Sequence, residues 1–242
     1  MTLRWIGTAA IVAAFAWRQR VTASPAAAWG LFKVRSFAGA TAYTLLTNLT
    51  MYTTLLMIPF FVREVQGKST ALSGLLLGAM SVLVAITAPF GGMLSDTWGR
   101  RPSAQVGSVL MLIGAVALLA GLSRTVSAGY LAGCLGVLGL GLGLGVGAAN
   151  TAAVESAPRA LAGSAAGTSS MMRYVGSIVG AGILAGVLTD SRAADGDVSA
   201  FRLVMLAVIL TAALAVVAAM FIHRFVAPEV IPVTREPALD PF

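Results

Sequence analysis

A short polar segment near residue 100 carries the side chains of this sequence best suited to charge pairing. It reads Gly92-Met93-Leu94-Ser95-Asp96-Thr97-Trp98-Gly99-Arg100-Arg101. A carboxylate in such a segment can face the positive end of a helix. Guanidinium groups can bind the carbonyl groups at a neighbouring helix C-terminus, or lipid phosphate. The glycines suit a tight connection in which the backbone approaches a neighbour closely or adopts a positive φ.

A row of hydroxyl groups lies inside one of the apolar stretches. Tyr43, Thr47, Thr50 and Thr54 are spaced four, three and four residues apart, and Asn48 lies nearby. This spacing puts the hydroxyl groups on one face of a helix. In lipid, such a face should point at other protein or at a water-filled cavity. The alternative to lining a cavity is that it only forms hydrogen bonds between helices.

Arg173 is a second polar side chain at depth in an apolar stretch. A cation inside a membrane is costly, so it is a functional candidate by default. The alternatives are that Arg173 reaches back to the membrane surface or pairs with Glu155.

The composition excludes most soluble classes of protein. Of the 242 residues, 58% are hydrophobic and 10% are charged, and the mean hydropathy is +0.90. A soluble domain carries about 25% charged residues. The single cysteine and single histidine, Cys134 and His223, provide no metal cluster and no disulfide. We therefore expect an all-α membrane protein that is not an enzyme, that binds neither a cofactor nor a metal ion, and that does not bind nucleic acid.

Six apolar runs are long enough to cross a bilayer, which takes roughly 20 residues. They are residues 36–62, 71–94, 104–122, 128–150, 164–188 and 201–222. A seventh run, 3–17, predicts a short N-terminal hydrophobic helix. A secretory signal is the alternative, which Arg18 and Arg20 disfavour because they follow the run directly.

Glycine alternates with larger residues over 139–147, as it would in a strand. An isolated strand cannot satisfy its backbone in lipid, so this run is predicted to be helical. Gly139, Gly143 and Gly147 then share one face, and Gly141 and Gly145 another. Small residues four apart indicate close packing against neighbouring helices.

The basic residues predict which side of the membrane each connection occupies. Alternating the connections puts more basic residues inside the cell than outside, which follows the positive-inside rule. The inner set is Arg18, Arg20, Lys33, Arg35, Arg100, Arg101, Arg159, Arg224 and Arg235. We therefore expect a multi-pass plasma-membrane protein with a cytoplasmic C-terminus. The proline-rich residues 224–242 read as a disordered cytoplasmic tail.

The segment 92–101 resembles the signature of the major facilitator superfamily, Gly-x-Leu-Ala-Asp-Arg-x-Gly-Arg-Arg/Lys. The sequence matches at Gly92, Leu94, Asp96, Gly99, Arg100 and Arg101, and departs at Ser95 and Thr97. Residues 30–223 are similar to the C-terminal half of the fourteen-span drug:proton antiporters. The match begins with Leu31-Phe32-Lys33-Val34-Arg35-Ser36-Phe37 and includes 168–180 around Arg173.

This resemblance implies six transmembrane helices that form one half of a major facilitator fold, whose substrate site lies between two halves. Residues 1–35 would hold a partial linking helix and a cytoplasmic loop, and 36–223 the six-helix half. The expected partners are the lipid bilayer, a small organic substrate and an N-terminal transporter half, encoded as a separate chain or as upstream sequence.

The resemblance also assigns roles to the residues above. Gly92, Asp96, Gly99, Arg100 and Arg101 would form the inner gate. The substrate path would be lined by Tyr43, Thr47, Asn48, Thr50, Thr54 and Arg173. The implied function is efflux of drugs or other small amphipathic organic compounds by alternating access. The alternative is a non-transporting truncated membrane protein, or a helix-packing subunit of a membrane complex.

Overall fold

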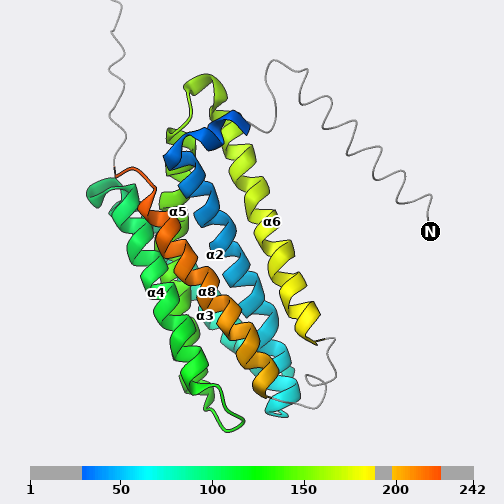
Figure 1. Ribbon diagram of the computed structural model, residues 1–242. Helices are drawn as coiled ribbons and strands as arrows, with labels where there is room; N and C mark the ends of the chain where they lie inside the picture. The colour runs from blue at the N-terminus through cyan, green and yellow to red at the C-terminus, as the bar shows by residue number, and fades with distance from the viewer. Residues whose placement is uncertain (1–28, 189–197, 225–242) are drawn as a thin grey trace, which may run out of the picture.

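The computed structural model describes residues 29–188 and 198–224, and within them six long helices form one bundle (Figure 1). The helices are α2 (Arg35–Phe60), α3 (Thr70–Trp98), α4 (Arg100–Gly121), α5 (Ala128–Glu155), α6 (Ala162–Leu188) and α8 (Val198–Met220). A π-helical turn, Phe61–Val65, continues α2, and short 3-10 turns, Trp29–Lys33 and Arg159–Leu161, precede α2 and α6.

The six predicted spans are confirmed as helices long and apolar enough to cross a membrane. Several helices run past the apolar stretch that predicted them. Asp96 therefore lies in the last turn of α3, and Glu155 is the last residue of α5. The predicted N-terminal helix at 3–17 lies outside the described residues, as does the predicted disordered tail from residue 225 onward.

The glycine-rich helix α5 lies at the centre of the packing, along α3 and α4. A Cβ on Gly107 of α4 would lie 2.6 Å from the Gly141 carbonyl oxygen. On the other glycine face, a Cβ on Gly139 would lie 2.8 Å from the Met80 carbonyl oxygen of α3. The two predicted glycine faces thus let α5 contact two neighbours at backbone distance. Helix α2 packs along α6 and α8 and closes the bundle.

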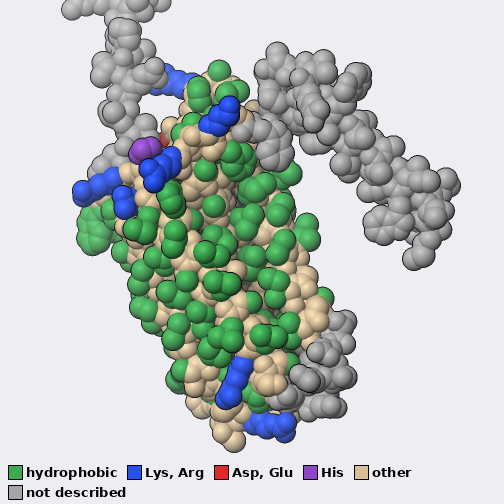
Figure 2. All heavy atoms as spheres, viewed as in Figure 1, with side chains coloured by type: hydrophobic (Ala, Val, Ile, Leu, Met, Phe, Trp, Pro, Cys, Tyr) green, Lys and Arg blue, Asp and Glu red, His purple; other side chains and the backbone are tan. Residues whose placement is uncertain are grey.

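Apolar side chains cover the outside of the bundle (Figure 2). Helices α3 and α6 are the least enclosed, with 17% of the residues of their apolar windows buried. Leu75 of α3 and Ile178 of α6 are 70% and 71% exposed. Such a surface needs lipid or another apolar protein surface around it.

Basic side chains gather at the end of the bundle where α2 begins and α3 ends, which is uppermost in Figure 2. The described basic residues there are Lys33, Arg35, Arg100, Arg101, Arg159 and Arg224. Those at the opposite end are Arg63, Lys68, Arg124 and Arg202. The excess is in the direction that the positive-inside rule associates with a cytoplasmic face.

Candidate functional site

The connection between α3 and α4 is a single residue, Gly99. Its φ of 104° is a conformation that residues with a Cβ rarely adopt, so glycine is required for this sharp reversal. The reversal brings the last turn of α3 beside the first turn of α4. Arg100, directly after the glycine, can then reach back over α3.

The Arg100 side chain, at the start of α4, binds the ends of two other helices at once. Its Nη1 donates to the Ser95 hydroxyl at 2.9 Å and to an Asp96 carboxylate oxygen, both on α3. Its Nε and Nη2 donate to the two oxygens of Glu155, at 3.0 and 2.8 Å, at the end of α5. The Arg100 side chain is 17% exposed and that of Asp96 is 72% exposed. Glu155, at 32%, is therefore the more enclosed carboxylate partner.

Arg100 also connects this cluster to the end of α8 through its backbone. Its N–H donates to the Arg224 carbonyl oxygen at 2.8 Å, and Arg224 Nε donates to the Trp98 carbonyl oxygen at 3.2 Å. Ser103, one turn further along α4, donates to the carbonyl oxygens of Gly91 and Leu144. The ends of α3, α4, α5 and α8 are therefore bonded together at one end of the bundle.

Gly92 has neither property that the sequence suggested for the motif glycines. A Cβ on Gly92 would meet nothing within 4 Å, and its φ is not positive. The neighbouring Gly91 makes the close approach instead, because a Cβ there would lie 2.6 Å from the Leu144 carbonyl oxygen of α5. One residue along a helix is about 100° of rotation, so only one of the two glycines can face α5.

A cavity of about 470 Å³ opens among α2, α3, α5 and α6. Its polar lining comes from three of these helices and consists of Thr47, Asn48, Tyr52, Asn150 and Arg173. The rest of the lining is apolar side chain and backbone, including Gly143 and Gly147 of the glycine-rich helix. This mixture of a wide apolar wall and a few convergent polar groups is typical of small-molecule sites.

Arg173 is the cation of this cavity. Its Nη2 donates to Asn150 Oδ1 at 3.2 Å, and its Nε is buried without a hydrogen-bond partner. The ion pairs among the described residues join Glu155 to Arg100 and do not include Arg173, so the alternative that Arg173 pairs with Glu155 is wrong. Asn150 lies on α5 about one and a half turns before Glu155, which places the guanidinium inside the helical bundle.

The predicted hydroxyl face divides in the structure. Thr47 and Asn48 line the cavity, whereas Tyr43, Thr50 and Thr54 are fully buried and are not among its lining residues. Thr50 Oγ1 lies 2.8 Å from Thr211 Oγ1 of α8, so this hydroxyl bridges two helices.

The hydroxyl face divides because residues of α2 point in different directions around the helix axis. At about 100° per residue, the centre of the Tyr43–Thr54 face lies roughly 150° around the helix from the side that carries Asn48 and Tyr52. Helices α5 and α8 cover the first side, and the cavity adjoins the second. Thr47 lies on the border between them and donates to the Tyr43 carbonyl oxygen at 2.8 Å.

A comparison with protein families identifies the family of this chain. The profile described as the Major Facilitator Superfamily matches residues 6–181. The chain belongs to the Major Facilitator Superfamily.

Curated relatives in this superfamily include proteins named for drug resistance and export. The chain is 32% identical over 188 residues to "Multidrug resistance protein Stp" of Mycobacterium tuberculosis, covering 77% of this chain and 35% of the relative. It is 31% identical to "Uncharacterized MFS-type transporter YvkA" of Bacillus subtilis, covering 69% and 37%. It is 27% identical to "Tetracenomycin C resistance and export protein" of Streptomyces glaucescens, covering 80% and 36%. The chain thus spans about a third of the length of these relatives.

A solved major facilitator structure has the same fold. The inward-open form of the xylose transporter XylE from E. coli superposes with a TM-score of 0.63 at 19% identity. The match covers 80% of this chain and 48% of XylE. The fold class expected from the sequence is confirmed, and with it a multi-pass membrane protein. The Arg100 cluster and the Arg173 cavity are thus features of a major facilitator bundle.

Proposed function

We propose that this chain forms one side of an efflux transporter that moves small amphipathic organic compounds across the plasma membrane by alternating access. The observation that carries the proposal is the cavity with Arg173 and Asn150 among α2, α3, α5 and α6. The family membership and the relatives named for multidrug resistance and export support it.

The cavity suits a ligand with an apolar body and a polar end. Leu142, Val146 and Met51 offer apolar contact, and Thr47 and Asn150 offer hydrogen bonds. Arg173 supplies a positive charge, and none of the described lining residues is acidic. This wall of the path therefore favours a substrate group that is negatively charged or accepts hydrogen bonds.

The remaining wall of the path would come from a second six-helix unit. In major facilitator transporters the substrate site lies at the interface of two repeats. The cavity is flanked by α3 and α6, the two least enclosed helices, so a partner unit can pack there and cover it. We propose that this unit is a separate chain or upstream sequence.

The Arg100 cluster would serve as the inner gate. It joins the ends of four helices by charged and backbone hydrogen bonds, at the end of the bundle richer in basic residues. On the proposed orientation this end and the C-terminus are cytoplasmic. Bonds of this kind form when helix ends approach and break when they separate, as alternation requires.

A dye-accumulation assay tests the proposal. The chain is expressed together with the proposed second six-helix unit, as a separate chain or as upstream sequence, in a bacterium without its own efflux pumps, and retention of a fluorescent amphipathic dye is measured. Wild type is expected to lower retention of an anionic dye, and N150L and R173L to reduce that effect strongly. T50V, a substitution outside the cavity, is the matched control. Equal retention with and without the wild-type chain, for both anionic and cationic dyes, would contradict transport and favour a non-transporting subunit.

A further inference from the structure

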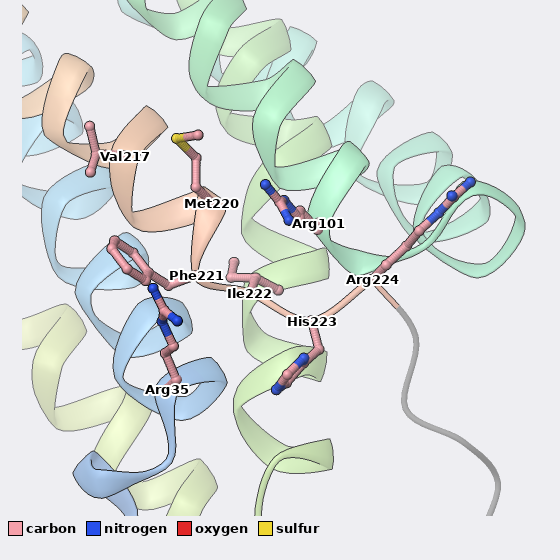
Figure 3. Close-up of a pocket in the computed structure, with 8 residues that line it drawn as sticks. All are labelled: Arg35, Arg101, Val217, Met220, Phe221, Ile222, His223 and Arg224. Carbon is pink, nitrogen blue, oxygen red and sulfur yellow. The ribbon is translucent and has the colours of Figure 1, made fainter.

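A second cavity, of about 500 Å³, lies at the basic end of the bundle, where α2 and α4 begin and α8 ends (Figure 3). Arg35, Arg101, His223 and Arg224 provide its polar lining. The other lining residues are Val217, Met220, Phe221 and Ile222 of α8 and the turn after it. The cavity shares no residue with the Arg173 cavity.

The charges of Arg35 and Arg101 have no carboxylate partner in the described part of the chain. None of the described lining residues is acidic, and none of the ion pairs among the described residues includes Arg35 or Arg101. Arg100, the neighbour of Arg101, has two carboxylate partners. Two arginines without a carboxylate partner at one cavity attract an anion with several oxygen acceptors, such as a phosphate.

Contacts orient two of the arginine side chains, those of Arg35 and Arg224. The Arg35 guanidinium lies over the Phe221 ring, 5.0 Å from its centroid, a cation–π contact. Arg224 donates to the Trp98 carbonyl oxygen and extends away from Arg35 and Arg101 in Figure 3. Arg35 and Arg101 are therefore the anion-binding pair, and Arg224 adds positive charge at the rim.

An apolar groove of about 420 Å³ continues from this cavity along α2 and α8. The two spaces share Arg35, Val217 and Phe221. Small residues, Ala38, Gly39, Ala42 and Ala218, line the groove, together with Leu46 and Leu214. From Arg35 to Leu46 the helix rises about 16 Å, which is close to the half-thickness of a bilayer's hydrocarbon core. The groove thus matches one acyl chain in one leaflet.

We propose that Arg35, Arg101 and the α2–α8 groove bind one anionic phospholipid. The phosphate lies between the two guanidinium groups, and one acyl chain lies in the groove. A soluble phosphate would use only the basic cavity, whereas a phospholipid uses both spaces, which are continuous. On the proposed orientation the site opens to the cytoplasmic leaflet, where anionic lipids attract basic residues. The test of this lipid site does not depend on transport through the Arg173 cavity, with which it shares no lining residue.

Native mass spectrometry of the purified full chain tests the headgroup. The chain in detergent is titrated with phosphatidylglycerol, and with phosphatidylcholine of the same acyl chains as the neutral reference. We expect selective retention of one phosphatidylglycerol. R35Q and R101Q should each weaken it about fivefold, the effect of one basic residue near a membrane surface. R63Q and K68Q, at the opposite end, are the matched controls. Equal retention of both lipids, or equal weakening by the control variants, would overturn the proposal.

A second variant tests the acyl-chain groove without changing charge. Ala42 is exposed and lines the groove, so A42W fills the groove from its outer side and leaves the bundle core unchanged. A42W should weaken phosphatidylglycerol retention at least fivefold, and excess inorganic phosphate should not displace the lipid from wild type. Displacement by inorganic phosphate together with unchanged retention in A42W would show a free-anion site and overturn the phospholipid assignment.

Discussion

Arg100 of α4 and Glu155 of α5 form a two-point ion pair, with Nε–Oε2 and Nη2–Oε1 distances of 3.0 and 2.8 Å. The two residues are 55 positions apart in the sequence. Asp96, the acid of the 92–101 motif, is close to Arg100 in sequence but is far more exposed than Glu155. The geometry therefore makes Glu155 the stronger structural partner of Arg100.

The first prediction compares these two carboxylates. E155A removes both Glu155 hydrogen bonds from the part-buried Arg100 guanidinium and leaves those to Ser95 and Asp96. It should lower the free energy of unfolding by roughly 1–3 kcal/mol. D96A removes an exposed pair and should cost less than about 1 kcal/mol. Unfolding of the purified variants in detergent micelles measures both. D96A proving more destabilising than E155A would contradict the assignment.

The second prediction concerns the close approach of α4 and α5. G107A and G141A each put a methyl group within 2.6 Å of backbone atoms of the other helix. Each should destabilise the bundle by about 1–3 kcal/mol, as overpacking does. G92A and G147A have open space at Cβ and serve as controls, with an expected change near zero. Thermal unfolding of the four variants checks this ranking, and equal stability of all four would contradict the packing.

The third prediction concerns the buried hydroxyl pair between α2 and α8. T50V removes one partner of the 2.8 Å contact with Thr211 and should cost about 1 kcal/mol. The double variant T50V/T211V should cost less than the sum of the single variants, because each single variant already loses the same Thr50–Thr211 hydrogen bond. A double-mutant cycle on unfolding measures this coupling. Strictly additive costs would show that the two hydroxyls do not interact.

The fourth prediction concerns substrate charge. Arg173 is the charged group among the described residues that line the proposed path. A hydrogen bond to a charged group contributes about 1.5–3 kcal/mol. R173L should therefore reduce efflux of an anionic dye at least tenfold. Efflux of a neutral dye of similar size should change much less. R173K retains the charge and should retain part of the anionic efflux. Equal losses for both dyes in R173L would indicate a structural role instead.

The sequence predicts the helices well and their contacts poorly. Apolar run length found all six spans, because hydrocarbon imposes both length and helicity on a buried segment. The glycine spacing of α5 correctly gave two packing faces. Helical periodicity put Thr50 and Thr47 on one face, but no local pattern says which neighbour that face meets. The sequence does not predict the Arg100–Glu155 ion pair, because a pairing across 55 residues depends on how the whole bundle packs.

The central claim, that the Arg173 cavity is part of a substrate path open to water, is tested most directly by cysteine labelling in membrane vesicles. Y52C and N150C place a thiol in the cavity lining, T50C places one between α2 and α8, and the buried Cys134 is replaced by serine in all three. We predict that a membrane-impermeant thiol reagent modifies Y52C and N150C but not T50C, and that a transported dye slows the modification. Modification of T50C as fast as of Y52C, or inert thiols at both cavity positions, would contradict the claim.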